Sequence, residues 1–299
     1  MAMGSPAPTP PPKSLWRVWR ERLCCTTDNS LNKDSYDQNS LPTHAYMEEP
    51  VAGSTPHSPG TGDQKLVERP EMAVEAGALY TGQWRGHVRH GKGTLKRENG
   101  EEYVGYFADG RKHGQGVFKA ANGSIYDGEW DQDRAHGFGK YTKPDGNVYE
   151  GEWRQNAKSG RGVETWPDGA SYEGEFMKSC KHGKGHYRSG TGVVYNGQFK
   201  QDRMDGDGDY IFADGRTYSG QWVAGHMSGK GKMEWPNGAK YEGGYEKGSK
   251  SGEGTFTSAD GRVYTGQWKA GKQDGTGTET DAHGNVTQGT WRAGERVDK

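Results

Sequence analysis

Hydrophobic side chains are scarce in this chain. Only 29% of its 299 residues are hydrophobic, and a further 50 residues are glycines, which have no side chain to bury. A thick globular core is therefore not expected. The three cysteines, Cys24, Cys25 and Cys180, are too few for a disulfide framework, and this scarcity favours a reducing, intracellular compartment.

Long apolar runs and an excess of one charge are also missing. No stretch approaches the roughly 18 apolar residues of a membrane-spanning helix. The chain begins with a proline-rich stretch, from Pro6 to Pro12, where a secretory signal would be apolar. The formal net charge is -1, so the chain as a whole has no electrostatic attraction to nucleic acid or anionic lipid, and we expect no nucleic-acid partner.

What the chain has instead is an internal repeat of 23 residues. Tyrosine recurs at this spacing from Tyr80 to Tyr264, and the next step falls on Thr287, so the last copy is degenerate. Glycine lies two residues after each of these positions, and an aromatic residue lies four residues after each. The aromatic residues of the motif are Tyr80, Trp84, Tyr103, Phe107, Tyr126, Trp130, Tyr149, Trp153, Tyr172, Phe176, Tyr195, Phe199, Tyr218, Trp222, Tyr241, Tyr245, Tyr264, Trp268 and Trp291.

Each copy has the pattern of a β-hairpin. A G-x-G motif begins one strand-like run, a turn signal such as Asn99-Gly100 follows, and Y-x-G-x-W forms the second run. Because side chains alternate between the faces of a strand, Tyr, Gly and Trp share one face and polar residues occupy the other. Both glycines of G-x-G, such as Gly91 and Gly93, are expected on the aromatic face. There the rings would cover bare glycine backbone of a neighbouring strand and replace a conventional core.

These hairpins predict an all-β fold. A single hairpin is marginal in water, so each copy must stack on the next. We expect an elongated twisted ribbon, or solenoid, of about ten stacked antiparallel β-hairpins over residues 77–299, with motifs starting at 80, 103, 126, 149, 172, 195, 218, 241, 264 and, in degenerate form, 287. Residues 1–76 have none of this period and are rich in Pro, Ser and Thr, so we expect them to be largely disordered.

The Y-x-G-x-W motif followed by G-x-G at this period resembles the MORN repeat (membrane occupation and recognition nexus). The resemblance extends from Tyr80 to Trp291, with departures at Thr191, Tyr245 and Thr287. It implies an all-β ribbon that acts as a scaffold. Members of this family link membranes to other membranes or to the cytoskeleton, occur in ciliary and flagellar structures, or carry the repeats before a lipid kinase or lysine methyltransferase domain.

A basic, amphipathic segment with the sequence KSLWRVWRERLCC occupies residues 13–25. As a helix it would gather apolar and tryptophan side chains on one face, a combination with arginine that suits a membrane interface. Cys24 and Cys25 are candidate S-palmitoylation sites, because two acyl chains with basic residues make a stable anchor. The alternatives are a segment that folds onto a protein partner and an inert one. The candidate membrane-interface residues are Lys13, Leu15, Trp16, Arg17, Trp19, Arg20, Arg22 and Leu23.

The sequence predicts no catalytic, cofactor or metal site. His90, His113, His136 and His182 each precede a G-x-G glycine, but equivalent positions in stacked hairpins lie about 10 Å apart, too far to share one metal ion. No pattern supplies a nucleophile, a base and an orienting group, so we expect no enzyme activity. The aromatic residues of the motif are either internal packing or anchors for a partner.

The sequence therefore favours a non-enzymatic scaffold or adaptor that binds protein partners along the ribbon and is tethered to membrane lipid by its N-terminal segment. The expected partners are cytoskeletal, ciliary or membrane-junction proteins. The expected location is cytoplasmic, at the inner face of a membrane, in the cell cortex or in a cilium or flagellum. The alternatives are a regulatory subunit or adaptor for a separate lipid kinase or methyltransferase, and a soluble ciliary component. An exposed ribbon end could also pair with a second copy and form a homodimer.

Overall fold

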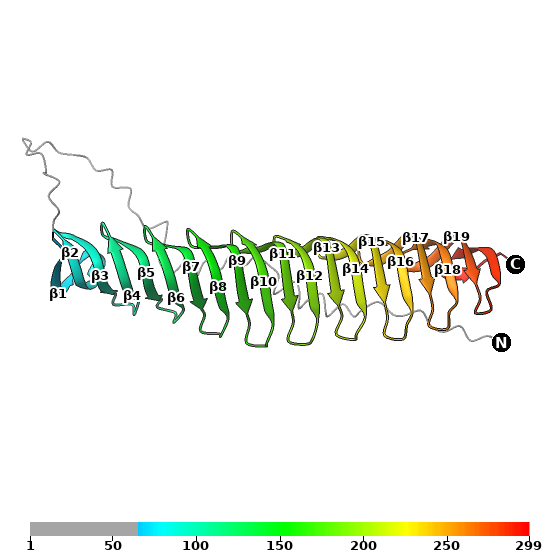
Figure 1. Ribbon diagram of the computed structural model, residues 1–299, viewed down its shortest axis with the longest axis horizontal. Coiled ribbons are helices and arrows are strands. Elements are labelled where there is room, and N and C mark those ends of the chain that lie inside the picture. Colours follow the sequence, from blue (N-terminus) through cyan, green and yellow to red (C-terminus); the bar gives the residue numbers. More distant parts are fainter. Residues whose placement is uncertain (1–64, 299) are drawn as a thin grey trace, which may run out of the picture. The chain divides into compact units, whose positions relative to one another are not determined.

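The computed structural model describes residues 65–298 (Figure 1). In this range the chain forms 21 β-strands and one 3-10 helix, η1 (Glu75–Gly77), which confirms the predicted all-β class. The segment 13–25, with Cys24 and Cys25, lies outside the described residues. The strands are β1 (Val67–Ala73), β2 (Leu79–Arg85), β3 (Val88–Lys96), β4 (Glu102–Ala108), β5 (Arg111–Lys119), β6 (Ile125–Asp131), β7 (Arg134–Thr142), β8 (Val148–Arg154), β9 (Ala157–Thr165), β10 (Ser171–Met177), β11 (Cys180–Arg188), β12 (Val194–Lys200), β13 (Arg203–Ile211), β14 (Thr217–Val223), β15 (His226–Glu234), β16 (Lys240–Glu246), β17 (Ser249–Thr257), β18 (Val263–Lys269), β19 (Lys272–Thr280), β20 (Val286–Arg292) and β21 (Glu295–Arg296).

The strands belong to two units. One unit contains β1 to β10, the other contains β12 to β21, and β11 contributes residues to both. Within each unit every strand pairs antiparallel with the next strand of the chain, so the predicted stacking of antiparallel hairpins is confirmed. From β2 to β18, the seven-residue strands carry the Y-x-G-x-W motif, and the nine-residue strands between them carry G-x-G.

Two kinds of connection complete the 23-residue period. From β2 to β19, a two-residue turn leads from each seven-residue strand into the following nine-residue strand, and a five-residue loop leads from each nine-residue strand to the next seven-residue strand. In the turn Gln155–Asn156 both residues have positive φ, 50° and 66°, as a type I′ turn requires. In the loop after β9, Asp168 accepts a hydrogen bond from the N–H of Ala170, which fixes the Asp-Gly turn predicted from the sequence.

The two glycines of G-x-G have different structural roles. The second glycine, such as Gly162, lies under the ring of Tyr149, as predicted. The first glycine, Gly160, has a φ of 54°, because the register between β8 and β9 shifts there and forms a bulge. A Cβ atom on Gly160 would meet the Glu152 carboxylate on the polar face. The expectation that both glycines lie on the aromatic face is therefore wrong for the first one.

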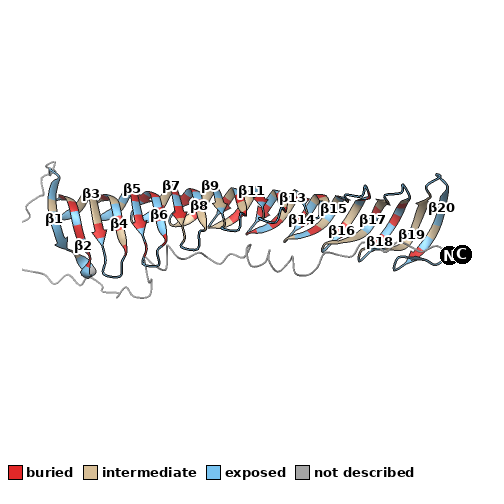
Figure 2. Cartoon of the chain, turned by 90° about the horizontal axis from the view of Figure 1, so that it is seen from below, coloured by how far each residue is buried: buried red, intermediate tan, exposed pale blue. Residues whose placement is uncertain are grey.

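Aromatic rings form the core of each unit. Buried residues alternate with exposed ones along the strands (Figure 2), and the nineteen aromatic residues of the motif are at most 7% exposed. The ring centroid of Tyr126 lies 5.0 Å from that of Trp130 and 5.2 Å from that of Trp153, both in edge-to-face geometry. The Tyr126 hydroxyl donates a hydrogen bond to the Glu129 carbonyl, and the Trp153 indole donates one to the Gly139 carbonyl. Tyr126 and Trp153 thus satisfy their polar atoms with nearby backbone carbonyls.

One strand outside the regular repeat pairs with the first motif strand, and another pairs with the last. β1, which the repeat period did not predict, pairs with β2, and its Arg69 covers the Trp84 ring at 5.2 Å. Arg296 of β21 covers the Trp291 ring in the same way at 5.6 Å. β1 also contains Pro70 and a register irregularity, and both features disfavour pairing with a further strand. A homodimer through the β1 edge is therefore not favoured.

Tyr245 is a polar defect in the aromatic core, because its buried hydroxyl has no hydrogen-bond partner among the described residues. The other copies have Trp or Phe at this position. We expect Tyr245→Phe to raise the free energy of unfolding by about 1–3 kcal/mol, since it removes an unsatisfied polar group and keeps the ring. Urea unfolding followed by circular dichroism measures the change.

Tyr241→Phe is the matched control for this substitution. The Tyr241 hydroxyl donates a hydrogen bond to the Gly244 carbonyl at 3.0 Å, so its loss should lower the free energy of unfolding by about 1 kcal/mol. If both substitutions destabilised the protein equally, the expectation for Tyr245 would be wrong.

Candidate binding face

Cations lie on the aromatic face at one repeat position that the sequence analysis did not single out. The position is nine residues after each motif tyrosine, and it is paired across the strands with the second aromatic residue of the motif. Lys112, for example, pairs with Phe107, and Lys158 pairs with Trp153. The only signal in the sequence was a basic residue recurring in phase with the repeat. We call Arg89, Lys112, Lys158, Lys181 and Lys250 the repeat cations.

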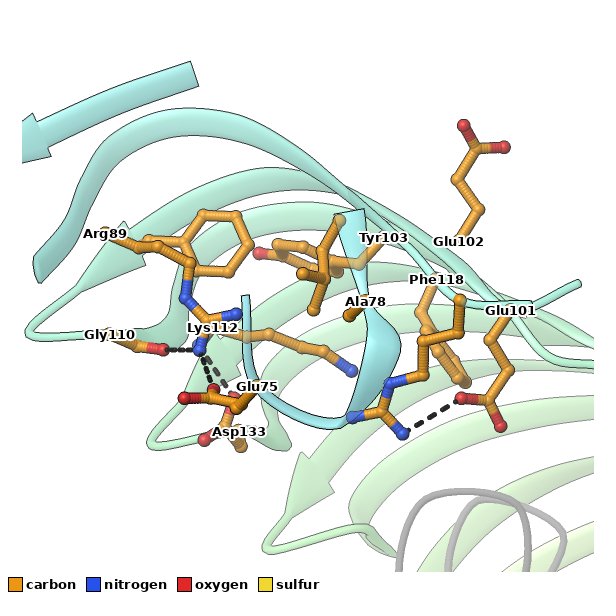
Figure 3. A pocket seen from close by; sticks show the side chains of 13 residues that line it. Glu75, Ala78, Arg89, Glu101, Glu102, Tyr103, Gly110, Lys112, Phe118 and Asp133 are labelled. Carbon is orange, nitrogen blue, oxygen red and sulfur yellow. Dashed lines mark hydrogen bonds and ion pairs between the residues drawn. The ribbon is translucent and has the colours of Figure 1, made fainter. Parts of the chain in front are cut away.

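Arg89 borders a small cavity of about 90 Å³ near η1 (Figure 3). Its guanidinium donates hydrogen bonds to the Glu75 carboxylate at 2.6 Å and to the Gly110 carbonyl at 2.9 Å. Ligand pockets usually have roughly 300–1,000 Å³, so this cavity does not fit a cofactor. Helix η1 thus brings a carboxylate to the first repeat cation.

Lys112 lies among three aromatic rings of the same unit. Its Nζ is 4.1 Å from the ring centroid of Phe118, 4.7 Å from that of Trp130 and 5.3 Å from that of Tyr103. Burial lowers the pKa of Lys112 to about 8, and the charge of Asp133 opposes this shift. Asp133 also accepts a hydrogen bond from the Lys112 backbone N–H. The ammonium is therefore stabilised both by ring faces and by a carboxylate.

Lys158 and Lys181 have carboxylate partners inside the core. The Lys158 ammonium lies 2.6 Å from a Glu164 oxygen, and Glu164 occupies a position that is aromatic or apolar in most other copies. The Lys181 ammonium lies 3.9 Å from a carboxylate oxygen of Asp202, a turn residue. Both pairs are largely buried, so removal of one partner would leave a costly buried charge.

Lys250 lies among four rings and has no such partner. Its Nζ is 4.4 to 5.2 Å from four ring centroids, and burial lowers the pKa of Lys250 to about 8 without any contribution from a charged neighbour. Within residues 65–298, no hydrogen bond or ion pair reaches this ammonium. The rings are those of Trp235, Tyr241, Phe256 and Trp268.

The opposite face is mostly polar but carries exposed apolar side chains. Val104 and Val117 are cross-strand neighbours on β4 and β5 and are both exposed. Tyr106 on β4 is 43% exposed, and Phe138 on β7 is 54% exposed. We call these four residues the outer patch, in which β6 separates Phe138 from the three residues of β4 and β5. Exposed aromatic side chains on a polar surface are typical of protein contacts.

The residues predicted from the motif form the core. Of the two sequence hypotheses for the motif aromatics, their burial favours internal packing. The four histidines that precede a G-x-G glycine lie in strands. The ring of one of them, His90, accepts a hydrogen bond from the Asp109 N–H. Over residues 65–298, no three His, Cys, Asp or Glu side chains gather into a metal site. No helix in that range is long and apolar enough to cross a membrane.

The sequence was compared with protein-family models. The model described as the MORN repeat matches nine consecutive copies, which span residues 80–286. The chain belongs to the MORN repeat family. The match begins at Tyr80 and stops before Thr287, where the degenerate copy begins. In that copy, β20 still places the ring centroid of Trp291 4.9 Å from that of Tyr264. MORN repeats support a repeat scaffold, and the family is generally non-catalytic.

Solved structures were also compared with the MORN array. The wild-type TCP10 domain of Danio rerio CPAP is 12% identical in sequence and aligns with a TM-score of 0.37. The alignment covers 75% of this chain and 99% of the TCP10 domain. The SAS-4 (dCPAP) TCP domain of Drosophila melanogaster was solved with a proline-rich motif of Ana2 (dSTIL). It is 14% identical in sequence and aligns with a TM-score of 0.32, and the alignment covers 64% of this chain and 96% of the TCP domain. A search of the curated proteins found no match.

Proposed function

We propose that this MORN repeat protein is a non-enzymatic scaffold that binds protein partners with its β-array. The observation that carries this proposal is the outer patch, in which Tyr106 and Phe138 are exposed on a mostly polar face. Paired strands hold these side chains in place, so a partner would bind a surface that is already ordered. Tyrosine is among the residue types enriched at the few positions that supply most of the binding energy at protein interfaces.

Affinity purification of the full chain tests the protein-binding proposal. We expect the double substitution Tyr106→Ser/Phe138→Ser to lower recovery of the main partners by at least about tenfold, as loss of interface anchors does. Val286→Ser is the control, because Val286 is also exposed but lies outside the outer patch. Unchanged recovery with the double variant would refute the role of the patch. Mass spectrometry then separates cytoskeletal or ciliary partners from a stoichiometric kinase or methyltransferase.

The proposal also includes a membrane tether in the N-terminal segment. Residues 13–25 carry four Lys and Arg against Glu21, whereas residues 77–299 carry 32 Lys and Arg against 30 Asp and Glu. The local charge therefore supports lipid binding by the segment and gives the repeats little attraction to anionic lipid. The scaffold would then lie at the cytoplasmic face of a membrane.

The adjacent cysteines allow a direct test of this tether. We expect Cys24→Ser/Cys25→Ser to lower the membrane-bound fraction by at least about tenfold, because basic residues without acyl chains bind weakly and reversibly. Cell fractionation measures the fraction, and Trp16→Ser/Trp19→Ser examines the amphipathic face separately. Equal membrane recovery of the cysteine variant and the native chain would rule out an acyl anchor.

A further inference from the structure

Lys250 differs from the other repeat cations in lacking a carboxylate. The fold brings an acidic side chain close to each of the other four repeat cations. This acid belongs to η1 in one case, to the strand of the cation in another, and to the turn of the following hairpin in the other two. Ion pairs join Arg89 to Glu75, Lys158 to Glu164 and Lys181 to Asp202. At Lys112 the acid is Asp133, which binds the Lys112 backbone N–H and whose charge acts on the ammonium. The array therefore shows a rule for this position, and Lys250 is the exception within the described residues.

The sequence explains why the chain does not supply the missing acid. Glu164 follows Lys158 by six residues, and Asp202 follows Lys181 by twenty-one. The corresponding positions after Lys250 are Phe256 and Gly271. Phe256 instead places its ring centroid 4.4 Å from the ammonium, so the acid of the Lys158 site is replaced by a ring.

A second polar group at the same place also lacks a partner. The indole N–H of Trp235 is buried and has no acceptor among the described residues, and the Trp235 ring centroid lies 5.2 Å from the Lys250 Nζ. Trp235 and Phe256 are only half-buried, so solvent reaches part of these two side chains. Two hydrogen-bond donors without acceptors thus lie beside aromatic rings of which two, those of Trp235 and Phe256, are partly exposed.

We propose that this site, formed by Lys250, Trp235, Tyr241, Phe256 and Trp268, binds a side-chain carboxylate of a partner protein. The partner residue is an aspartate or glutamate with an apolar neighbour, because the carboxylate meets the ammonium and the neighbour meets the rings. A carboxylate fits better than a phosphate, since the site offers one positive charge and the chain itself uses carboxylates at the equivalent positions. The inference rests on the proposed protein-binding function and names the chemistry of the partner.

The probe for this site is an octapeptide of alternating leucine and glutamate, with a leucine–glutamine octapeptide as its control. Fluorescence anisotropy measures the binding of each labelled peptide to the full chain. We expect the glutamate peptide to bind at least about tenfold more tightly, as a charge-assisted hydrogen bond predicts. In nitrogen NMR of lysine side chains, the Lys250 signal should shift on addition of the glutamate peptide only.

Two substitutions of the site should remove the preference for glutamate. Lys250→Met deletes the charge and should fold, because Met204 and Met227 occupy the equivalent position in other copies. Phe256→Glu places a carboxylate at the position that Glu164 has relative to Lys158, so the chain would neutralise Lys250 by itself. Glu164→Phe is the reciprocal variant: it leaves Lys158 without its acid and should add a second glutamate-binding site.

The outcomes separate this inference from the proposed function. Equal binding of the glutamate peptide by Lys250→Met and the native chain would overturn the carboxylate site, and so would an unshifted Lys250 signal. Displacement of the peptide by free acetate at equal concentration would also overturn it, because the site would then favour a small anion. The outer-patch experiment measures the recovery of partner proteins, whereas this experiment measures peptide binding. If the chain bound the glutamate peptide specifically but recovered no partner protein, only the proposed function would be contradicted.

Discussion

Raising the pH above about 10 is expected to unfold the repeat array in one cooperative step. Tyrosine ionises near pH 10 in an unfolded chain. Burial raises the pKa of Tyr80 to about 12 and raises the pKa values of eight further core tyrosines. These eight tyrosines are Tyr103, Tyr126, Tyr149, Tyr195, Tyr218, Tyr241, Tyr245 and Tyr264.

The sign of the effect follows from proton binding. Above pH 10 the unfolded chain loses its tyrosine protons while the folded chain keeps them, so the free energy of unfolding falls as pH rises. With nine tyrosines the slope is on the order of 5–10 kcal/mol per pH unit after a discount for partial solvent access. Lys112 and Lys250 act in the opposite direction between about pH 8 and 10, because burial lowers their pKa to about 8. Stability should therefore be greatest just below pH 10.

Two optical signals measured on the same samples check this expectation. Tyrosinate absorbance reports ionisation, and far-ultraviolet circular dichroism reports the strands. We expect both signals to change together over about one pH unit, because the buried hydroxyls ionise only when the strands separate. Smooth ionisation of most tyrosines near pH 10 with unchanged circular dichroism would contradict the expectation.

The regular part of the fold could be predicted because each repeat carries its own strand and turn signals. The spacing of tyrosine, glycine and tryptophan gives the hairpins, the buried face and the covering of Gly162 by Tyr149. The bulge at Gly160 could not be predicted from alternation along one strand, because it arises from the register between two strands. β1 was missed because residues 67–73 contain no copy of the motif.

The candidate site was less predictable than the fold. A lysine that follows a turn is usually solvated, so nothing in a single copy indicates that Lys250 lies among rings. That placement depends on its pairing with Tyr245 across the strands and on the rings of three other strands or loops. The acids at Glu164 and Asp202 become informative only when the copies are superposed in three dimensions, because they occupy two different repeat positions.

Substitution of a ring-covered glycine is the second change with a large expected effect. An ideal Cβ atom on Gly162 would lie 2.6 Å from Cε2 and from Oη of Tyr149, which is buried on all sides. Alanine normally stabilises a strand by roughly 0.5–1 kcal/mol relative to glycine. Here we expect Gly162→Ala to lower the free energy of unfolding by about 3 kcal/mol, because the ring cannot move without disturbing its neighbours.

Two further variants assign this cost to the ring. Gly169→Ala, in the loop after β9, has open space around the new Cβ and only the left-handed φ of 81°, so it should cost about 1–2 kcal/mol. In a double-mutant cycle, Tyr149→Leu should recover at least about 1 kcal/mol of the Gly162→Ala loss, since leucine leaves room for the methyl group. Strict additivity of the two losses in urea unfolding would mean that the ring does not depend on bare backbone at this position, and that the packing of the MORN core has another origin.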